Sequence, residues 1–276
     1  MTWSDVPEAE IPPLGPMGYL RMVLRGVPLA LLVLVALFVL LVSRAVEAPL
    51  FGLRRPLTPY ITRFVCGTGL RILGIGFATS GEPMTQMGGT VANHASWLDI
   101  FSLNAADVLY FVSKAEVAKW PGIGFLARSV GTVFIRRDPK DAARQKALFE
   151  ARLGAGHKLL FFPEGTSSDG RRVLPFKSTL FAAFFADGLR ETCFIQPVSV
   201  SYHAPVGQSK RFYGWWGDME FAPHFLQTLG AAKQGRIEVV YHPALKVSEF
   251  ADRKALAAAC ENAVRAGVNP VVLSDV

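Results

Sequence analysis

The stretch VANHASWLD, residues 91–99, leads from a strand pattern into a helix. The strand pattern TVAN ends at Asn93, and Ser96 precedes Asp99 by three residues, which is the spacing of a capping box. This pattern predicts a helix that begins near Trp97. Two residues five apart on one helix point about 140° away from each other. His94 and Asp99 can therefore meet only if His94 lies in the loop and Asp99 in the first helical turn, so a helix cap and a catalytic pair are compatible interpretations.

Strand and helix patterns alternate around this stretch. The strand patterns are TVANH, VLYFVS, TVFIRR, KLLFFP, IQPVSVSY and IEVVYHP, and the helical patterns are DAARQKALFEARLGAG, STLFAAFFADGLR and DRKALAAACENAVRAG. Such alternation is typical of an α/β domain with a largely parallel sheet and flanking helices. We predict that this domain covers residues 79–276.

The N-terminal part of the chain has a different texture. Residues 1–20 are rich in proline and lack periodicity, which predicts a flexible tail. Residues 27–42, VPLALLVLVALFVLLV, approach the roughly 20 apolar residues needed to cross a bilayer. Residues 60–77 are also apolar, but Arg63 and Arg71 interrupt them and indicate an interfacial segment. We expect a membrane anchor of one or two helices, spanning or re-entrant, over residues 21–78.

A cleaved signal peptide is the alternative for the apolar run. The leader before it is long, and SRAVEAPL after it offers a poor small-residue cleavage site. Arginines are denser after the run than before it, so the positive-inside rule places the bulk of the protein on the cytoplasmic side.

Composition narrows the class of partner. The chain carries a formal charge of +7 and is 51% hydrophobic, so a basic surface must serve nucleic acid, anionic lipid or an acidic protein. It lacks zinc-finger spacing, a Lys/Arg-rich arm and an aromatic RNA-binding signature, which favours the membrane. The cysteines Cys66, Cys193 and Cys260 are odd in number and far apart, as expected for buried thiols in a reducing compartment.

Three further strand ends have polar or unusual residues. KLLFFPEGTSSDG ends in a turn at Glu164 and Gly165, GTVFIRR ends in Arg136 and Arg137, and IQPVSV contains Pro197. Each has a structural explanation of its own: a tight turn, solvated arginines and an edge-strand proline. Their order and spacing together with NHASWLD are harder to explain by structure alone. Open α/β sheets bind ligands beyond the C-terminal ends of their strands, where we expect the site to lie.

The four blocks NHASWLD, GTVFIRR, FPEGTSS and QPVSV resemble, in this order, those of the glycerolipid acyltransferase family typified by lysophosphatidic acid acyltransferases. The resemblance covers roughly residues 60–250. It implies the glycerolipid acyltransferase fold, with His94 as the general base on a lysolipid hydroxyl and Asp99 as the group that orients it. It also implies direct attack on the thioester of acyl-carrier protein or acyl-coenzyme A, as co-substrate, with no acyl-enzyme, metal or cofactor.

The resemblance further assigns the residues that bind the acceptor. The head group is expected at Arg136, Arg137, Glu164, Gly165 and Thr166, and Pro197 with Val198 is expected to shape the inner wall. Backbone N–H groups of the glycine turn are candidate donors to the tetrahedral oxyanion.

The third block departs from the common family pattern FPEGTRS. Ser167 stands where an arginine clamps a phosphate, so phosphate recognition is weaker or moves to Arg171, Arg172 or Lys177. The run FPEGTSSDGRRVLPFKSTLF, with WWGDMEFAPHFL at residues 215–226, resembles the bacterial branch that O-acylates lyso-ornithine lipid. That resemblance implies an enzyme of the bacterial inner membrane. Asp218 and Glu220 are candidate partners for the ammonium group of such an acceptor.

Other interpretations remain open at this point. The chain is alternatively a 1-acyl-sn-glycerol-3-phosphate acyltransferase, an enzyme with both activities, or a non-catalytic lipid binder on the membrane surface. A serine nucleophile is disfavoured because Ser96, Ser167 and Ser168 lack a G-x-S-x-G elbow. Trp120, Pro121 and Phe125 form a lipid-entry rim or ordinary packing. The other histidines (His157, His203, His224 and His242) are expected to be caps, surface residues or core hydrogen-bonding groups.

Overall fold

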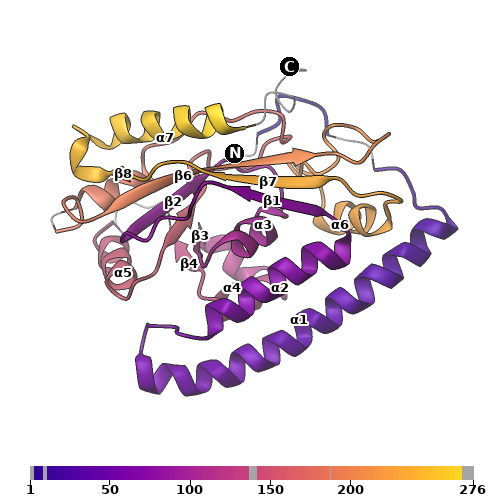
Figure 1. The fold of residues 1–276 in the computed structure, drawn as a ribbon, viewed down its shortest axis with the longest axis horizontal. Coiled ribbons are helices and arrows are strands. Elements are labelled where there is room, and N and C mark those ends of the chain that lie inside the picture. The colour runs from indigo at the N-terminus through magenta and orange to yellow at the C-terminus, as the bar shows by residue number, and fades with distance from the viewer. Residues whose placement is uncertain (1–2, 9–10, 137–141, 187, 269–276) are drawn as a thin grey trace.

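A single mixed sheet organises the chain in the computed structural model, which describes residues 3–8, 11–136, 142–186 and 188–268. Its strands follow the order β1 (Gly76–Ser80), β7 (Arg236–Tyr241), β6 (Phe194–His203), β2 (Gly88–Ala92), β5 (Leu159–Phe161), β3 (Tyr110–Lys114) and β4 (Val133–Ile135). The last five are mutually parallel, β7 is antiparallel to β6, and the short β8 (Leu245–Lys246) also pairs antiparallel with β6. The predicted largely parallel sheet with flanking helices is confirmed (Figure 1).

All six predicted strand patterns form strands, and two strands were not predicted. β1 comes from the end of the apolar segment 60–77, where the helical pattern hides it, and it pairs in parallel with β7 at the edge of the sheet. β8 has only two residues, too few to leave a pattern. The sheet therefore begins at Gly76, three residues before the domain boundary expected at residue 79.

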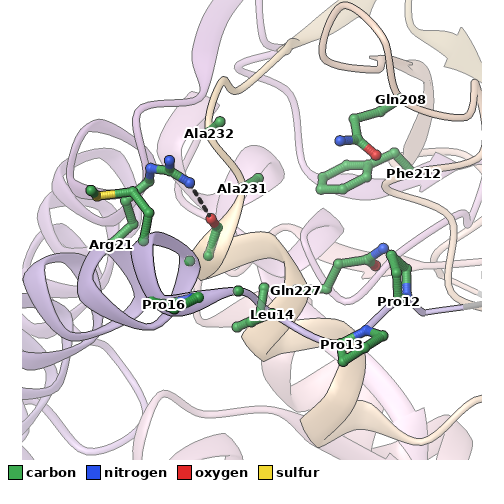
Figure 2. Close-up of a pocket in the computed structure, with 14 residues that line it drawn as sticks. Pro12, Pro13, Leu14, Pro16, Arg21, Gln208, Phe212, Gln227, Ala231 and Ala232 are labelled. Atoms are coloured by element: carbon green, nitrogen blue, oxygen red, sulfur yellow. Dashed lines mark hydrogen bonds between the residues drawn. The ribbon is translucent and has the colours of Figure 1, made fainter.

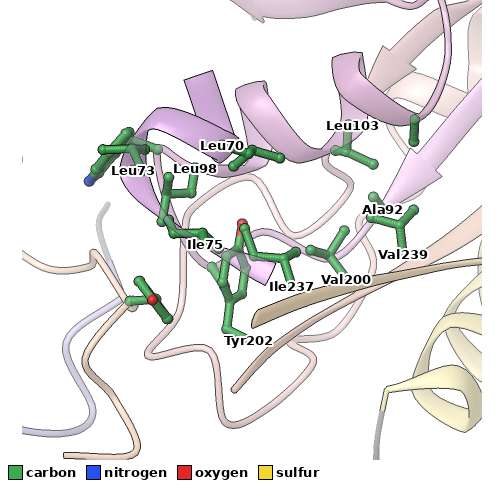
Figure 3. Packing of buried hydrophobic residues seen from close by; sticks show 14 of the residues in the cluster. Leu70, Leu73, Ile75, Ala92, Leu98, Leu103, Val200, Tyr202, Ile237 and Val239 are labelled. Atoms are coloured by element: carbon green, nitrogen blue, oxygen red, sulfur yellow. The ribbon is translucent and has the colours of Figure 1, made fainter. Parts of the chain in front are cut away.

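One face of the sheet is covered by α2 (Thr58–Leu73), α3 (Asp99–Ala106) and α6 (Phe221–Gly230), with α1 (Pro16–Phe51) outside them (Figure 1). Leucines of α2 and the α3 turn meet Val200, Tyr202 and Ile237 of the sheet in a buried cluster (Figure 3). Strand side chains alternate between faces, so β6 and β7 send every second residue into this cluster.

The opposite face carries α5 (Ala142–Gly154), the 3₁₀ helix η3 (Leu180–Phe185) and α7 (Arg253–Gly267). The predicted helix over STLFAAFFADGLR is only the short η3. Phe181 and Phe184, three residues apart, are both fully buried, which suits the three-residue turn of a 3₁₀ helix. Short connecting elements complete the fold: η1 (Ala115–Lys119), α4 (Ile123–Ser129) and η4 (Val247–Glu249). The three cysteines are buried and unpaired, as predicted.

The helix α1 is much longer than the apolar run that predicted it. Its 36 residues extend about 54 Å at 1.5 Å per residue, and most of the apolar side chains in its middle are exposed. By length and composition it is able to cross a membrane. Its inner side packs along α2, α4 and α6. α2, in contrast, buries Cys66, Leu70 and Leu73 in the domain core.

The arginines before the apolar run hold α1 against the end of α6. Arg25 donates to the carbonyl oxygens of Leu229 and Ala231. Arg21 donates to the carbonyl oxygen of Gly230, as Figure 2 shows. These carbonyls end α6, where helix geometry leaves oxygens without partners and the helix dipole favours cations. The two side chains thus fasten α1 to the domain.

The expected flexible tail over residues 1–20 does not match the described residues. α1 begins at Pro16, because proline is favourable in the first turn of a helix. Trp3 is buried against Trp216 and Met219, so the first described residues also pack on the domain.

Candidate active site

The turn after β2 brings His94 and Asp99 together. His94 Nδ1 lies 2.6 Å from Asp99 Oδ2. The predicted capping pattern makes this possible: the Ser96 N–H donates to Asp99 Oδ2 at 3.1 Å, and the Leu98 N–H donates to Ser96 Oγ at 3.3 Å. The regular helix begins at Asp99, two residues later than expected, because residues 97–98 form a turn.

The Asp99 carboxylate is fully buried and accepts hydrogen bonds from four groups. Oδ2 accepts from His94 Nδ1–H and from the N–H groups of Ala95 and Ser96, and Oδ1 accepts from the Tyr202 hydroxyl. Burial and the nearby Asp99 raise the pKa of Tyr202 well above its ordinary value, so the phenol stays a neutral donor. A carboxylate held in this way fixes the imidazole tautomer with the proton on Nδ1, which leaves Nε2 as an acceptor.

The imidazole of His94 is positioned from a second side and still reaches solvent. Its ring stacks on Phe162 at 4.1 Å between centroids and an angle of 11°. Its side chain is 24% exposed, whereas Asp99 is 0% exposed. A partly exposed imidazole held by a buried carboxylate is an arrangement suited to a general base.

The PEGT turn follows β5, the neighbour of β2 in the sheet. Ser168, two residues after this turn, donates its N–H to the His94 carbonyl at 2.9 Å, so the segment that follows β5 contacts the backbone of the predicted base. Gly165 adopts a φ of +76°, a conformation that favours glycine, and its N–H donates to the Phe162 carbonyl at 3.1 Å. This amide, predicted as a possible oxyanion donor, is therefore engaged within the turn.

Glu164 lies beneath the turn and is 1% exposed. Its Oε1 accepts from the Leu174 N–H at 3.3 Å, and the backbone of His94 also interacts with the carboxyl group. Burial raises its pKa well above the ordinary value. In this position Glu164 ties the β2 and β5 turns together from inside.

Arg136 is exposed at the end of β4. In the strand order β4 is three positions from β2, so Arg136 is about 14 Å to one side of the His94 strand. Arg137, the other predicted cation, lies outside the described residues.

Pro197 is buried in the middle of β6, opposite Val91. An edge-strand proline was the structural alternative, and it is wrong because β6 is interior. β8 pairs with Phe194 and Ile195, β7 pairs from Val198 onward, and the proline sits in the break between them. Its carbonyl accepts from His242 N–H on that side, so the missing proline N–H costs no ladder bond.

The WWGDME segment also reaches the turn that holds His94 and Asp99. Trp215 N–H donates to the Ala95 carbonyl at 2.8 Å, and Asp218 and Glu220 are exposed nearby in sequence. Asp169, in the loop after the PEGT turn, is buried and forms ion pairs with Arg172 and Arg211. Arg172, one proposed substitute for the missing phosphate clamp, is thus already paired.

Sequence reasoning missed Phe162 and Tyr202, and it considered Ser168 only as a nucleophile. Phe162 and Ser168 flank the PEGT motif, so its position at a strand end was the available signal. Tyr202 is 103 residues from Asp99 and has no motif, and only the sheet brings it there.

The remaining histidines are hydrogen-bonding groups, as predicted. His224 accepts from Trp97 Nε1 and donates to the Phe212 carbonyl, His203 pairs with Glu238, and His242 contacts Ser199. Within the described residues no three His, Cys, Asp or Glu side chains gather as a metal site would require. The predicted absence of a metal remains a prediction.

Two hollows lie elsewhere on the molecule. One of about 380 Å³ is lined by Pro12, Leu14, Arg21 and Phe212 (Figure 2). The other, a groove of about 940 Å³, runs between the apolar sides of α1 and α2. Neither contains a predicted site residue.

Comparison with known proteins agrees with this geometry. A family model described as "Acyltransferase" matches residues 87–201, which hold His94, Asp99, the PEGT turn and most of β6. The chain is 56% identical over 266 residues to a lyso-ornithine lipid O-acyltransferase of Rhodobacter capsulatus, covering 96% of each protein. The chain belongs to the acyltransferase family.

More distant relatives extend the comparison. A 1-acyl-sn-glycerol-3-phosphate acyltransferase of Neisseria gonorrhoeae is 32% identical over 181 residues, covering 64% of this chain and 68% of the relative. The crystal structure of a 1-acyl-sn-glycerophosphate acyltransferase from Thermotoga maritima superposes with a TM-score of 0.56 and 21% identity, covering 90% of this chain and 97% of that one. This likeness concerns the fold. Family membership makes the chain an acyltransferase enzyme.

Proposed function

We propose that this acyltransferase moves a fatty acyl chain from a thioester to the free hydroxyl of a lyso-aminolipid, with lyso-ornithine lipid as the acceptor. The observation that carries the chemistry is the His94–Asp99 pair. A histidine that is held at Nδ1 by a buried carboxylate, with a side chain that is 24% exposed, is suited to remove a proton through Nε2.

The proposed reaction runs in two proton-balanced steps. His94 Nε2 accepts the proton of the acceptor hydroxyl while the hydroxyl oxygen forms a bond to the thioester carbonyl carbon. The tetrahedral intermediate then expels the thiolate of acyl-carrier protein or coenzyme A, which takes the proton back from the imidazolium. Asp99 remains ionised and stabilises the imidazolium between the steps.

The choice of acceptor is supported by two observations. The relative that is 56% identical is a lyso-ornithine lipid O-acyltransferase. Ser167 replaces the phosphate-clamping arginine, and the neighbouring Arg172 is engaged with Asp169. An amino-acid head group needs no phosphate clamp, and Asp218 and Glu220 are proposed to meet its ammonium.

We also propose that the enzyme acts at the bacterial inner membrane with its catalytic domain facing the cytoplasm. The exposed apolar face of α1 supports membrane association, and arginine density supports the orientation. The proposed acceptor-binding set remains Arg136, Arg137, Glu164, Gly165, Thr166 and Pro197, with Glu164 and Pro197 acting from buried positions.

Lysophosphatidate acylation is the second candidate, favoured by the 32% identical relatives of that activity. The test is to incubate purified protein in lipid vesicles with acyl-carrier-protein thioester or acyl-coenzyme A and with each lysolipid. We expect turnover of lyso-ornithine lipid, lost in the His94→Ala variant. Strong turnover of lysophosphatidate with none of lyso-ornithine lipid contradicts the proposed acceptor. Lipid binding without turnover of either supports the non-catalytic alternative.

A further inference from the structure

The first described residues form a strap across the catalytic side of the domain. We use this name for residues 3–8. Trp3 N–H donates to Thr166 Oγ1 at 3.3 Å, the Trp216 indole N–H donates to the Val6 carbonyl, and the Asp218 N–H donates to Glu8. The strap therefore joins the PEGT turn to the WWGDME segment, the two segments that contact the backbone of the His94 turn.

Trp3 is the anchor of the strap. It is buried, and its ring lies 6.5 Å from that of Trp216. Its own indole N–H donates to Asp5 at 2.8 Å, which sets the orientation of the ring. A buried tryptophan whose indole N–H is hydrogen-bonded is held in one orientation.

The face of the Trp3 ring meets a cation. The guanidinium carbon of Arg172 lies 5.0 Å from the ring centroid. Two nitrogens of the same guanidinium donate to Asp169, with Nε 3.2 Å from Oδ1 and Nη2 3.2 Å from Oδ2. Arg172 is thus held between an indole face and a carboxylate.

This arrangement bears on which acceptors the site admits. Arg172 lies five residues beyond Ser167, so it is a candidate to replace the absent phosphate-clamping arginine. An arginine clamps phosphate through a bidentate fork of N–H groups. Here Nε and Nη2 are engaged by Asp169, and the Trp3 ring covers one face of the guanidinium. In addition, the Thr166 hydroxyl accepts a hydrogen bond from the strap.

We propose that Trp3 is a specificity-determining residue: by retaining Arg172 and engaging Thr166, it disfavours acceptors that carry a phosphate. This inference rests on the proposed function, because it assumes that the acceptor head group reaches the PEGT turn. It assigns to the N-terminal strap a part in the selection of lyso-aminolipid over lysophosphatidate.

The experiment measures the ratio of turnover with lysophosphatidate to turnover with lyso-ornithine lipid, using full-length protein in vesicles. Trp3→Ala is expected to raise this ratio about fivefold, the scale of one cation–π contact. Trp3→Phe, which keeps an aromatic face for Arg172, is the matched control and is expected to change it less than about twofold. A ratio makes the result independent of a general loss of stability, which lowers both activities equally.

A double variant shows whether Trp3 acts through Arg172. The Trp3→Ala increase is expected to disappear in Trp3→Ala/Arg172→Gln. An unchanged or lowered ratio in Trp3→Ala, or the same increase with and without Arg172, overturns the proposal. Failure of the proposed function gives a different result, because the unsubstituted enzyme then leaves lyso-ornithine lipid unacylated. If only the proposal for Trp3 is wrong, the unsubstituted enzyme still acylates lyso-ornithine lipid.

Discussion

Two histidines of this protein have nearly the same local geometry and partners of opposite charge. His94 stacks on Phe162 at 4.1 Å, and its Nδ1 bonds to a residue five positions later; His157 stacks on Tyr110 at 3.9 Å, and its Nδ1 bonds to a residue five positions earlier. The partner of His94 is the carboxylate of Asp99, and the partner of His157 is the guanidinium of Arg152.

The sign of the partner and the access to solvent separate their roles. Asp99 stabilises a protonated His94, and the side chain of His94 is 24% exposed. Burial, reinforced by Arg152, lowers the pKa of His157 to about 4, and His157 is only 3% exposed. A stacked, hydrogen-bonded histidine is therefore not a base by geometry alone. To act as a base, such a histidine also needs a hydrogen-bonded anion at one ring nitrogen and access for the substrate at the other.

The most direct way to break the comparison is to remove each imidazole. We expect His94→Ala to lower kcat about 10⁴-fold, the upper range for loss of a general base. His157→Gln, the matched variant, is expected to leave kcat within about twofold for folded protein. Both are measured by acyl transfer in vesicles at equal amounts of folded enzyme. Comparable losses in the two variants contradict the assignment of His94 as the base.

The second prediction concerns the partner. Asp99→Asn is expected to lower kcat about 10³-fold with little change in KM, because a neutral amide no longer stabilises the imidazolium that forms when His94 accepts a proton. Steady-state kinetics with the acceptor varied separates the two parameters. A rise in KM with kcat unchanged assigns Asp99 to substrate binding instead.

The third prediction concerns His157 and the dependence of stability on pH. The unfolded chain protonates His157 below about pH 6.5, whereas the folded protein does so only near pH 4. Acidification from pH 7 to 4 therefore draws the equilibrium toward the unfolded state, by at most about 3 kcal/mol from this residue. His157→Gln is expected to flatten the fall of Tm with decreasing pH over that window.

The fall of Tm with pH must be compared between the His157→Gln variant and the unsubstituted protein. Glu164 changes stability in the opposite direction. Because folding raises the pKa of Glu164, acidification protonates it in the folded protein first and so favours the folded state. Parallel Tm curves for the His157→Gln variant and the unsubstituted protein mean that His157 is not held neutral by its surroundings.

Among the three residues around the His94–Asp99 pair, the smallest expected loss of kcat belongs to Tyr202. Tyr202→Phe removes the donor to Asp99 Oδ1 and keeps the ring in the core, so we expect about a tenfold loss of kcat. If Tyr202 acts by positioning the pair, the same substitution has little further effect in the His94→Ala background. A full additional tenfold loss there assigns Tyr202 a role independent of His94.

Much of the fold was readable from local pattern. Six strand segments and the helices α5 and α7 follow from periodicity, because these signals are contained within one element. The errors occur where tertiary contacts decide. β1 pairs at an edge without a strong pattern, η3 is a short 3₁₀ turn set by two buried phenylalanines, and the N-terminal residues pack through Trp3.

The candidate site divides in the same way. The sequence alone determined the capping turn that brings Asp99 to His94, since both partners lie within six residues and the geometry of a helix start joins them. The tertiary structure alone decided that Tyr202 completes the carboxylate shell, that Glu164 is buried, and that Arg172 is held between Asp169 and Trp3. Local hydrogen bonds are encoded by spacing, whereas burial and the sign of a distant neighbour depend on which strands lie side by side.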